Sequence, residues 1–165
     1  GIGGGGLLEG KLMHGLVHPE MGHILIPRQR ADDAYPGNGP FHGDCLEGLA
    51  SGPAIEQRWG KPARELGPDH EAWVLEARYL ALALNSWVCS LSPKRFVLGG
   101  GVMNQLHLFP MIRRELAGIL NGYIRTGEII NGLNDYVVPP KLGGHAGVLG
   151  SLVLADLALA SKSGK

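Results

Sequence analysis

Acidic and basic residues balance in this sequence, so it carries no excess of charge of either sign. Of its 165 residues, 15 are Lys or Arg and 15 are Asp or Glu, and charged residues make up only 18%. A surface for nucleic acid or for acidic lipids needs a concentration of positive charge. We therefore expect this segment to bind no nucleic acid.

Long apolar runs and cysteines are also scarce. The longest apolar stretches, Leu80–Val88 and Val148–Leu159, are interrupted by Asn85 and Asp156 and fall short of the ~20 residues that a membrane span needs. Two cysteines cannot build a disulfide framework, and the first residues lack the pattern of a signal peptide. The sequence therefore predicts a cytoplasmic protein with no membrane partner, and its 44% of apolar residues is enough for one domain.

Glycine is the residue in excess. The 27 glycines are roughly twice the share expected at the ~7% average. They gather in clusters instead of repeating, which argues against collagen and low-complexity sequence and indicates loops that approach a ligand. The chain opens on such a cluster, Gly1-Ile2-Gly3-Gly4-Gly5-Gly6, with no methionine before it. We therefore expect a fragment that begins inside a motif.

Hydrophobic periodicity predicts an α/β chain. Short apolar runs indicate strands, the first two forming a hairpin that turns at Gly10, and longer runs with one apolar face indicate helices. The expected hairpin covers 5–13, and the other strands cover 23–27, 95–98 and 136–138. The expected helices cover 46–50, 52–59, 71–91, 109–120 and 145–160. Alternation of the two is typical of the α/β class.

A polar segment, residues 28–43, is rich in Asp, Pro, Gly and Asn. A loop of that length needs a function or a clamp, and a metal ion would be a clamp. His23, His42 and Cys45 flank it, all zinc-ligand types, and the spacing of the last two lets one tight turn present both to one ion. Three ligands are fewer than a closed site needs, and the alternative is ordinary loop residues that make hydrogen bonds.

Two motifs carry a specific resemblance. His18-Pro-Glu-Met-Gly-His23 is followed, beyond the loop, by Gly39-Pro-Phe-His-Gly-Asp-Cys-Leu-Glu-Gly-Leu-Ala-Ser-Gly-Pro-Ala54. Both resemble segments of ROK-family sugar kinases, fructokinases above all, and the similarity covers essentially the whole chain. It implies the ribonuclease H-like fold of actin-type ATPases. Residues 1–165 would form the C-terminal domain of the kinase, with 28–45 as its metal- and sugar-binding loop.

The resemblance implies a sugar site. Glu20, His23 and Glu47 correspond to family residues that hydrogen-bond sugar hydroxyls, a task that suits carboxylates and imidazole. For the two glutamates taken alone, helix capping or a solvated surface is the competing interpretation. His23 would have two roles, because its ring would be positioned by the metal while it contacts sugar.

The resemblance also implies a zinc site with one ligand missing. In the family, the metal is held by residues matching His23, His42 and Cys45 and by a further cysteine, whose place Gly39 takes here. Glycine has no side chain to coordinate a metal, so we expect a weakened or empty Zn²⁺ site unless water or a nearby carboxylate fills the vacancy. The candidate carboxylates are Asp32, Asp33 and Asp44.

Two glycine clusters would form a nucleotide site. The first, residues 1–5, resembles the end of the family's phosphate-binding turn, where backbone N–H groups approach a phosphate. The second, in residues 97–102, resembles the nucleotide-binding segment of actin-like kinases. Turn geometry is the competing explanation for each. The implied nucleotide-binding residues are Gly1, Gly3, Gly99, Gly100, Gly101 and Asn104.

Two smaller expectations concern packing. The glycines of 143–147 would permit close helix packing near the nucleotide site. Cys89, within an apolar stretch of the longest helix, is most simply a small core residue.

The implied reaction is ATP-dependent phosphorylation of a hexose, here expected to be fructose, giving fructose 6-phosphate. Mg²⁺ would bridge the ATP phosphates, and transfer would depend on positioning and electrostatics. The family's general base is an aspartate upstream of the phosphate-binding turn and outside this sequence, so we assign no catalytic residue and expect the fragment alone to be inactive. Family members are often dimers through this half, and the apolar helices would permit a homodimer.

Two other functions remain open from the sequence. A ROK transcriptional repressor shares the sugar and zinc segments, although its zinc motif has a different spacing. A zinc hydrolase would also have three ligands, an open position and a carboxylate base, but it leaves the glycine clusters unexplained.

Overall fold

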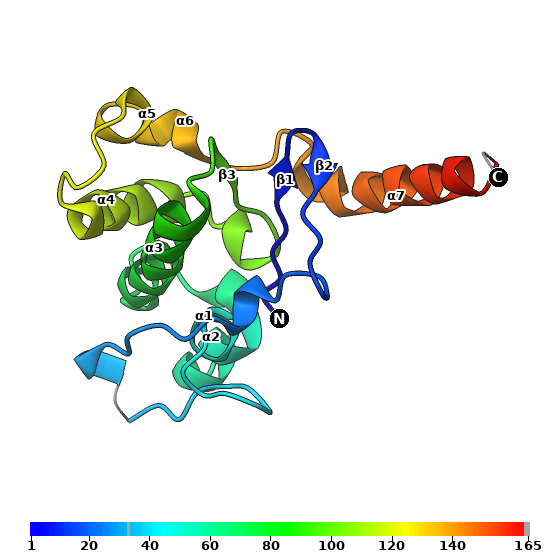
Figure 1. Ribbon diagram of the computed structural model, residues 1–165. Coiled ribbons are helices and arrows are strands. Elements are labelled where there is room, and N and C mark those ends of the chain that lie inside the picture. Colours follow the sequence, from blue (N-terminus) through cyan, green and yellow to red (C-terminus); the bar gives the residue numbers. More distant parts are fainter. Residues whose placement is uncertain (33, 164–165) are drawn as a thin grey trace.

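Two long helices form the main core of the computed structural model, which describes residues 1–32 and 34–163 (Figure 1). α3 (Ala72–Leu91) packs along α4 (Leu108–Leu120). Their fully buried apolar side chains include Trp73, Ile112 and Leu116. Each such side chain contributes about 1.5–3 kcal/mol by leaving water, so this helix pair dominates the packing.

Capping residues fix where the helices begin and end. α2 (Gly52–Trp59) starts at Ser51, whose hydroxyl accepts a first-turn N–H, and stops at Gly60 with φ of 71°. α3 and α4 stop at Ser92 and Asn121, which adopt the left-handed conformation with φ of 46° and 45°. These are familiar helix-end signals. The expected helix ranges are confirmed to within one residue, except that the last, expected at 145–160, extends to Ser163.

A smaller apolar cluster surrounds α1 (Leu46–Ala50) where it meets α3. The 3-10 helix η1 (Met21–His23) also contacts α1 and so joins the N-terminal segment to this cluster. The buried members are Ile26, Leu46, Leu49, Ala50, Tyr79 and Ala83.

The strands are few and short. β1 (Leu7–Leu8) and β2 (Lys11–Leu12) form the expected antiparallel hairpin, with its turn at Glu9-Gly10, where both residues have positive φ. β3 (Phe96–Val97) pairs in parallel with β4 (Val137–Val138), and α4 lies between them in the chain. This parallel pair with a helical crossover carries the expected α/β character.

The remaining elements are single turns that connect these parts. They are η2 (Arg30–Asp32), η3 (Ala63–Glu65), η4 (Val102–Asn104), α5 (Gly127–Ile130), α6 (Leu133–Tyr136) and η5 (Gly143–His145).

The strand expected at 23–27 forms only in part. His23 closes η1, and the chain becomes extended after it. The extended stretch pairs with the start of α1: Ile26 N–H donates to the Asp44 carbonyl at 3.1 Å, and Leu46 N–H donates to the Ile24 carbonyl at 2.9 Å. Leu25 therefore faces Cys45 as a single bridge, which brings His23 beside that cysteine.

α7 (Ala146–Ser163) projects away from the rest of the molecule (Figure 1). The expectation of close packing at 143–147 is wrong, since a Cβ built on Gly143, Gly144 or Gly147 meets no described atom within 4 Å. Cys89 is also exposed and not in the core. Among the described residues, one helix, Gly143–Ala160, is long and apolar enough to cross a membrane by length and composition alone.

Candidate functional site

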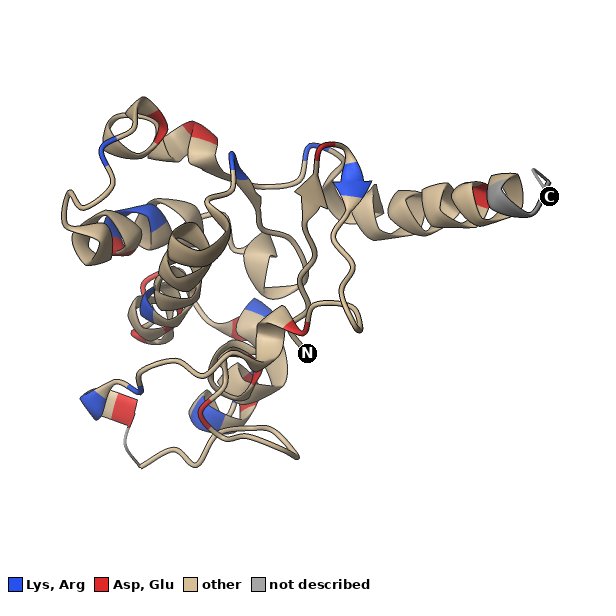
Figure 2. Ribbon diagram, viewed as in Figure 1, with Lys and Arg blue, Asp and Glu red and all other residues tan. Residues whose placement is uncertain are grey.

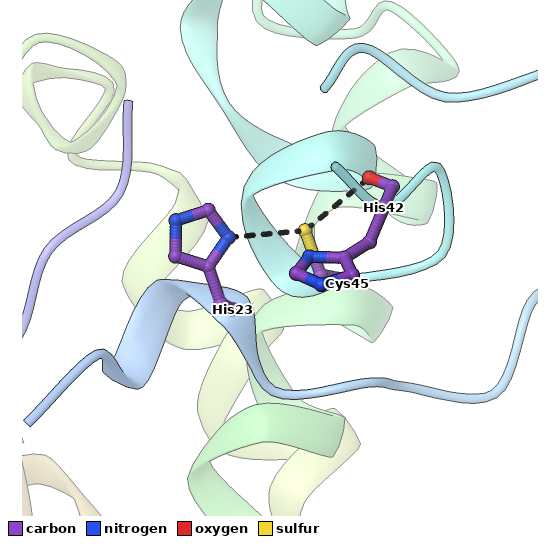
Figure 3. A group of neighbouring side chains, drawn as sticks. All are labelled: His23, His42 and Cys45. Atoms are coloured by element: carbon purple, nitrogen blue, oxygen red, sulfur yellow. Dashed lines mark hydrogen bonds between the residues drawn. The ribbon is translucent and has the colours of Figure 1, made fainter. Parts of the chain in front are cut away.

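Three potential metal ligands converge where η1, the polar loop and the start of α1 meet. The ligand atoms of His23, His42 and Cys45 all lie within 4.8 Å of one another (Figure 3). His23 Nδ1 is 3.8 Å from Cys45 Sγ, and the two imidazole ring centres are 5.5 Å apart. The structure therefore brings together all three ligands expected from the sequence.

The spacing fits a metal of zinc's size. Tetrahedral bonds of about 2.05 Å to nitrogen and 2.3 Å to sulfur place those two atoms about 3.6 Å apart. The separation of His23 Nδ1 and Cys45 Sγ, 3.8 Å, is close to that value. Zinc also binds well to imidazole and thiolate, whereas sites made only of carboxylates suit other metals.

Cys45 has a second structural role, because it is the N-cap of α1. Its sulfur accepts the backbone N–H of Gly48 at 3.3 Å and lies 3.5 Å from the carbonyl oxygen of His42. The side chain is buried, so this sulfur is held rigidly at the helix start. The same atom thus caps a helix and faces the two histidines.

Of the carboxylates considered from the sequence, the two that the structure describes, Asp32 and Asp44, do not take the place of a ligand at Gly39. A Cβ on Gly39 would lie 2.6 Å from the His42 carbonyl oxygen, which places this glycine beside the cluster. Asp44 accepts from Arg28 Nε at 2.9 Å, and Asp32 is bound elsewhere. Neither belongs to the cluster formed by the described residues, and Asp33 lies outside them.

Arg28 fastens the two ends of the loop. Its guanidinium donates to the carbonyls of Asp32, at 3.2 Å, and Tyr35, and it pairs with the carboxylate of Asp44. One side chain therefore joins the first half of the loop to the residue that precedes Cys45. These contacts of Arg28 hold the loop and involve only protein groups.

Arg58 anchors the loop from α2. Its guanidinium forms a bidentate pair with buried Asp32 at 2.7 and 3.0 Å and donates to the Leu49 carbonyl at 2.7 Å. Tyr79 O–H donates to the same aspartate at 2.7 Å. Burial and this hydrogen bond raise the pKa of Tyr79 to about 12, so its proton stays in place. Arg58 also stacks 4.1 Å from the Tyr35 ring centre.

The expected sugar-binding residues lie on neighbouring segments. Glu47, on α1, accepts the N–H of Ile2 through Oε2 at 2.6 Å. Gly22 packs directly against the Ile2 carbonyl, where a Cβ would clash. His23 follows this glycine and Glu20 lies two residues before it, and a 3.0 Å hydrogen bond joins His23 N–H to the Glu20 carbonyl. Ile2 thus contacts both Glu47 and the segment that carries Glu20 and His23.

The expected nucleotide-binding glycines differ in their surroundings. Gly1 lies against the carboxylate of Glu47, and Gly99 lies against Pro140. A Cβ on Gly3, Gly100 or Gly101 would meet no described atom within 4 Å, and Gly100 has φ of 98°. Asn104 is exposed at the end of η4. Close packing therefore accounts for Gly99, whereas Gly3, Gly100 and Gly101 have room for a ligand.

The loop also borders a groove of about 860 Å³ beside α2 and α3, with Arg58 and Arg78 in its wall. The residues that line it include neither the three metal ligands nor the three expected sugar-binding residues. The groove is therefore separate from the candidate site.

Sequence reasoning missed the residues that hold the loop. Arg28, Arg58 and Tyr79 were not singled out, because no local motif marks them and their partners lie up to 50 positions away. Arginine side chains are mostly exposed to solvent, so nothing in the sequence indicated that these would form buried contacts.

Glu76 is a second unforeseen feature. This carboxyl is fully buried in α3, and no hydrogen-bond partner is found for either oxygen within the described part of the chain. Burial raises the pKa of Glu76 well above its usual value, against the opposing effect of Arg58. The side chain is therefore neutral at pH values where an exposed glutamate is ionised.

Known proteins resemble this chain over nearly its full length. A protein of Bacillus subtilis (strain 168), provisionally named a fructokinase, is 50% identical over 99% of this chain and 54% of its own. The fructokinase of Pediococcus pentosaceus is 41% identical over 96% of this chain and 54% of its own. The chain thus spans about half the length of these curated relatives.

The fold is shared with a solved sugar kinase. The crystal structure of the ROK hexokinase from Thermus thermophilus superposes on 98% of this chain and 55% of its own with a TM-score of 0.74, at 28% identity. The sequence pattern that defines the ROK family matches residues 1–157 of this chain. The chain belongs to the ROK family.

Proposed function

We propose that this chain is the sugar-binding C-terminal half of an ATP-dependent fructokinase, with a ribonuclease H-like fold over residues 1–165. The relatives named as fructokinases, at 41% and 50% identity, support this assignment. One observation of the structure carries it: Glu47 accepts a hydrogen bond from Ile2, and Gly22, in the segment that carries Glu20 and His23, packs on the same residue. Segments that carry two carboxylates and an imidazole therefore meet at Ile2, and these groups suit the recognition of vicinal hydroxyls.

The proposed roles follow from what each group offers. Glu20 and Glu47 would accept hydrogen bonds from fructose hydroxyls. His23 presents Nδ1 to Cys45 and its other ring nitrogen away from it (Figure 3). The imidazole can therefore face a metal on one side and sugar on the other.

Nucleotide and metals complete the proposal. Gly3, Gly100 and Gly101, together with Gly1, Gly99 and Asn104, would contact ATP, whose phosphates Mg²⁺ would bridge. The three ligands and loop 28–45 would hold Zn²⁺ as a structural ion, with water in the fourth position. No step of the reaction is assigned to a residue of this chain.

Sugar binding by the 165-residue chain tests the proposal directly. Saturation-transfer NMR is expected to show fructose bound more strongly than glucose or mannose, and Glu47→Ala is expected to abolish the signal. Glu56→Ala, at an exposed position of α2, is the matched control and is expected to keep it. Absence of a fructose signal from folded wild-type chain, or its persistence in Glu47→Ala, would contradict the proposal.

A further inference from the structure

α3 contains a carboxyl group that has no hydrogen-bond partner in the described part of the chain. The charged residues of this helix are Glu76 and Arg78, both in its first half (Figure 2). Arg78 pairs with Glu115 at 3.3 Å, whereas Glu76 is 1% exposed and both of its oxygens are buried without a partner among the described residues. An ionised carboxylate that is buried and unpaired is very unfavourable, so the Glu76 side chain keeps its proton.

Glu76 lies close to the contacts that fasten the polar loop. Tyr79 is three residues further along α3, so both side chains leave the same face of the helix. The Tyr79 hydroxyl donates to Asp32, and the Arg58 guanidinium lies 5.9 Å from the Tyr79 ring centre. The charge of Arg58 reaches Glu76, since it opposes the rise in the pKa of that carboxyl. Two buried carboxyls, Asp32 of the loop and Glu76 of the helix, therefore lie near one guanidinium.

The two carboxyls differ in what they are attached to. Asp32 belongs to η2 and leaves with the loop whenever the loop detaches, whereas Glu76 is fixed in the longest helix. Detachment alone would leave the largely buried Arg58 without a counter-charge, which is strongly unfavourable. Glu76 can supply that charge if it gives its proton to the solvent that enters as the loop leaves.

We propose that Glu76 is the alternative counter-ion of Arg58, so that residues 28–38 detach by exchanging the Asp32–Arg58 pair for a Glu76–Arg58 pair with the release of one proton. In the attached form, Glu76 is neutral and Asp32 binds the guanidinium. In the detached form, Glu76 is ionised and the guanidinium turns to it. Because one proton is released, a rise in pH favours detachment, by up to about tenfold for each pH unit. The same loop continues to His42, so its detachment also opens the candidate site.

The other ionisable groups around α3 do not give this pH dependence. Burial and a hydrogen bond raise the pKa of Tyr79 to about 12, so it stays neutral. His107, at the start of α4, has a buried Nε2 without a partner among the described residues, and its ring lies 5.1 Å from that of Trp73. A buried neutral histidine gains a proton on exposure, so His107 would favour detachment at low pH, which is the opposite sign. The remaining charged side chains on η2, α1, α2 and α4 are at least partly exposed: Arg30, Glu47, Glu56, Arg113, Arg114 and Glu115.

Native-state hydrogen exchange in chelator-treated protein tests the proposal. Two amides report attachment of the loop, because Gln29 N–H donates to the Tyr79 hydroxyl at 3.3 Å and Asn38 N–H donates to the Gly48 carbonyl at 2.7 Å. The amide of Leu84, fully buried in α3, reports global unfolding. After correction for intrinsic exchange, we expect the opening constants of Gln29 and Asn38 to exceed that of Leu84 and to rise at least about tenfold between pH 5 and pH 7.5.

Glu76→Gln removes the proton that the exchange releases and is expected to hold this rise below about twofold. Glu56→Gln, at an exposed position of α2, is the matched control and is expected to keep the full rise. The proposal is overturned if the two variants rise alike, if the wild-type constants do not rise with pH, or if both amides exchange only as fast as that of Leu84. Constants that fall as pH rises would assign the dependence to His107 and would overturn it as well.

A second measurement leaves residue 76 unchanged. The carboxyl carbon of Glu76, observed by NMR, is expected to titrate at least about one pH unit lower in Asp32→Asn than in the wild type, because Arg58 then has no other counter-charge. An unchanged titration in folded Asp32→Asn would contradict the proposal. None of these measurements involves sugar, so their outcome is independent of the fructokinase proposal.

Discussion

Gly39 stands at the position where the family resemblance implies a fourth metal ligand, a cysteine. We predict that Gly39→Cys tightens zinc binding by more than tenfold, because a fourth thiolate closes the coordination sphere. A Cβ here approaches the His42 carbonyl at 2.6 Å, so the loop must shift slightly to accept it. Gly39→Ala is the control, since it adds the same Cβ without the sulfur. Competition with a chromogenic chelator measures both affinities, and equal values for the two variants would show that the vacancy is not at residue 39.

Buried Glu76 is predicted to make stability depend on pH. The pKa of Glu76 is higher in the folded chain than its unfolded value of about 4.3. Its contribution to folding stability is therefore fully present below about pH 4.3 and is lost as pH rises through the folded pKa. The free energy of unfolding then falls by up to about 1.4 kcal/mol per pH unit in that window. We expect Glu76→Gln to flatten this slope in urea unfolding between pH 4 and 8. Glu56→Gln, on the exposed face of α2, is expected to leave this slope unchanged. If the free energy of unfolding had the same slope with pH in both variants, the prediction would be refuted.

Asp32 accepts three side-chain hydrogen bonds, two from Arg58 and one from Tyr79. Asp32→Asn leaves a buried guanidinium without its counter-charge, and breaking such a pair typically costs about 3–5 kcal/mol. We therefore expect a loss of this order in the free energy of unfolding, together with faster hydrogen exchange in residues 28–36. Asp69→Asn, in an exposed connection, serves as the comparison. A loss below about 1 kcal/mol for Asp32→Asn would mean that the pair does not hold the loop.

At the scale of elements, the start of α1 is coupled to the metal cluster through one sulfur. Ser can replace Cys45 as an N-cap acceptor, whereas Ala cannot. In metal-free protein we predict that Cys45→Ala is less stable than Cys45→Ser by about 1 kcal/mol. Both variants are expected to lose zinc binding. Denaturant unfolding and zinc titration of the same preparations separate the two roles, and equal stabilities would argue that the cap contributes little.

At the scale of the whole molecule, local signals predicted the elements and failed to predict their surroundings. Ser51 and Gly60 mark the ends of α2, and the apolar face around Trp73 marks α3, so their ranges could be read from the sequence. The grouping of His23, His42 and Cys45 was also predicted, because these residues stand in recognisable motifs. The arginine contacts that hold the loop were not predicted, since no local motif marks them and the pair of Arg58 with Asp32 joins residues 26 positions apart.

Solvent exposure of side chains was the other property that local sequence patterns could not predict. Cys89 occurs in an apolar stretch yet is exposed on α3, and Val148, Leu152 and Leu157 of the apolar helix α7 are exposed as well. A sequence gives the polarity of a segment, whereas its environment depends on which other segments fold against it.

The contacts of Arg28 and Arg58 have a kinetic consequence for the metal. Because these side chains hold the loop in place, ordering of the loop need not accompany each binding event. The ligands are then already assembled when an ion arrives, and His42 is exposed to solvent at the entrance. We expect zinc to enter and leave in single-exponential steps without refolding, so that the occupancy of the site follows the free zinc concentration around it.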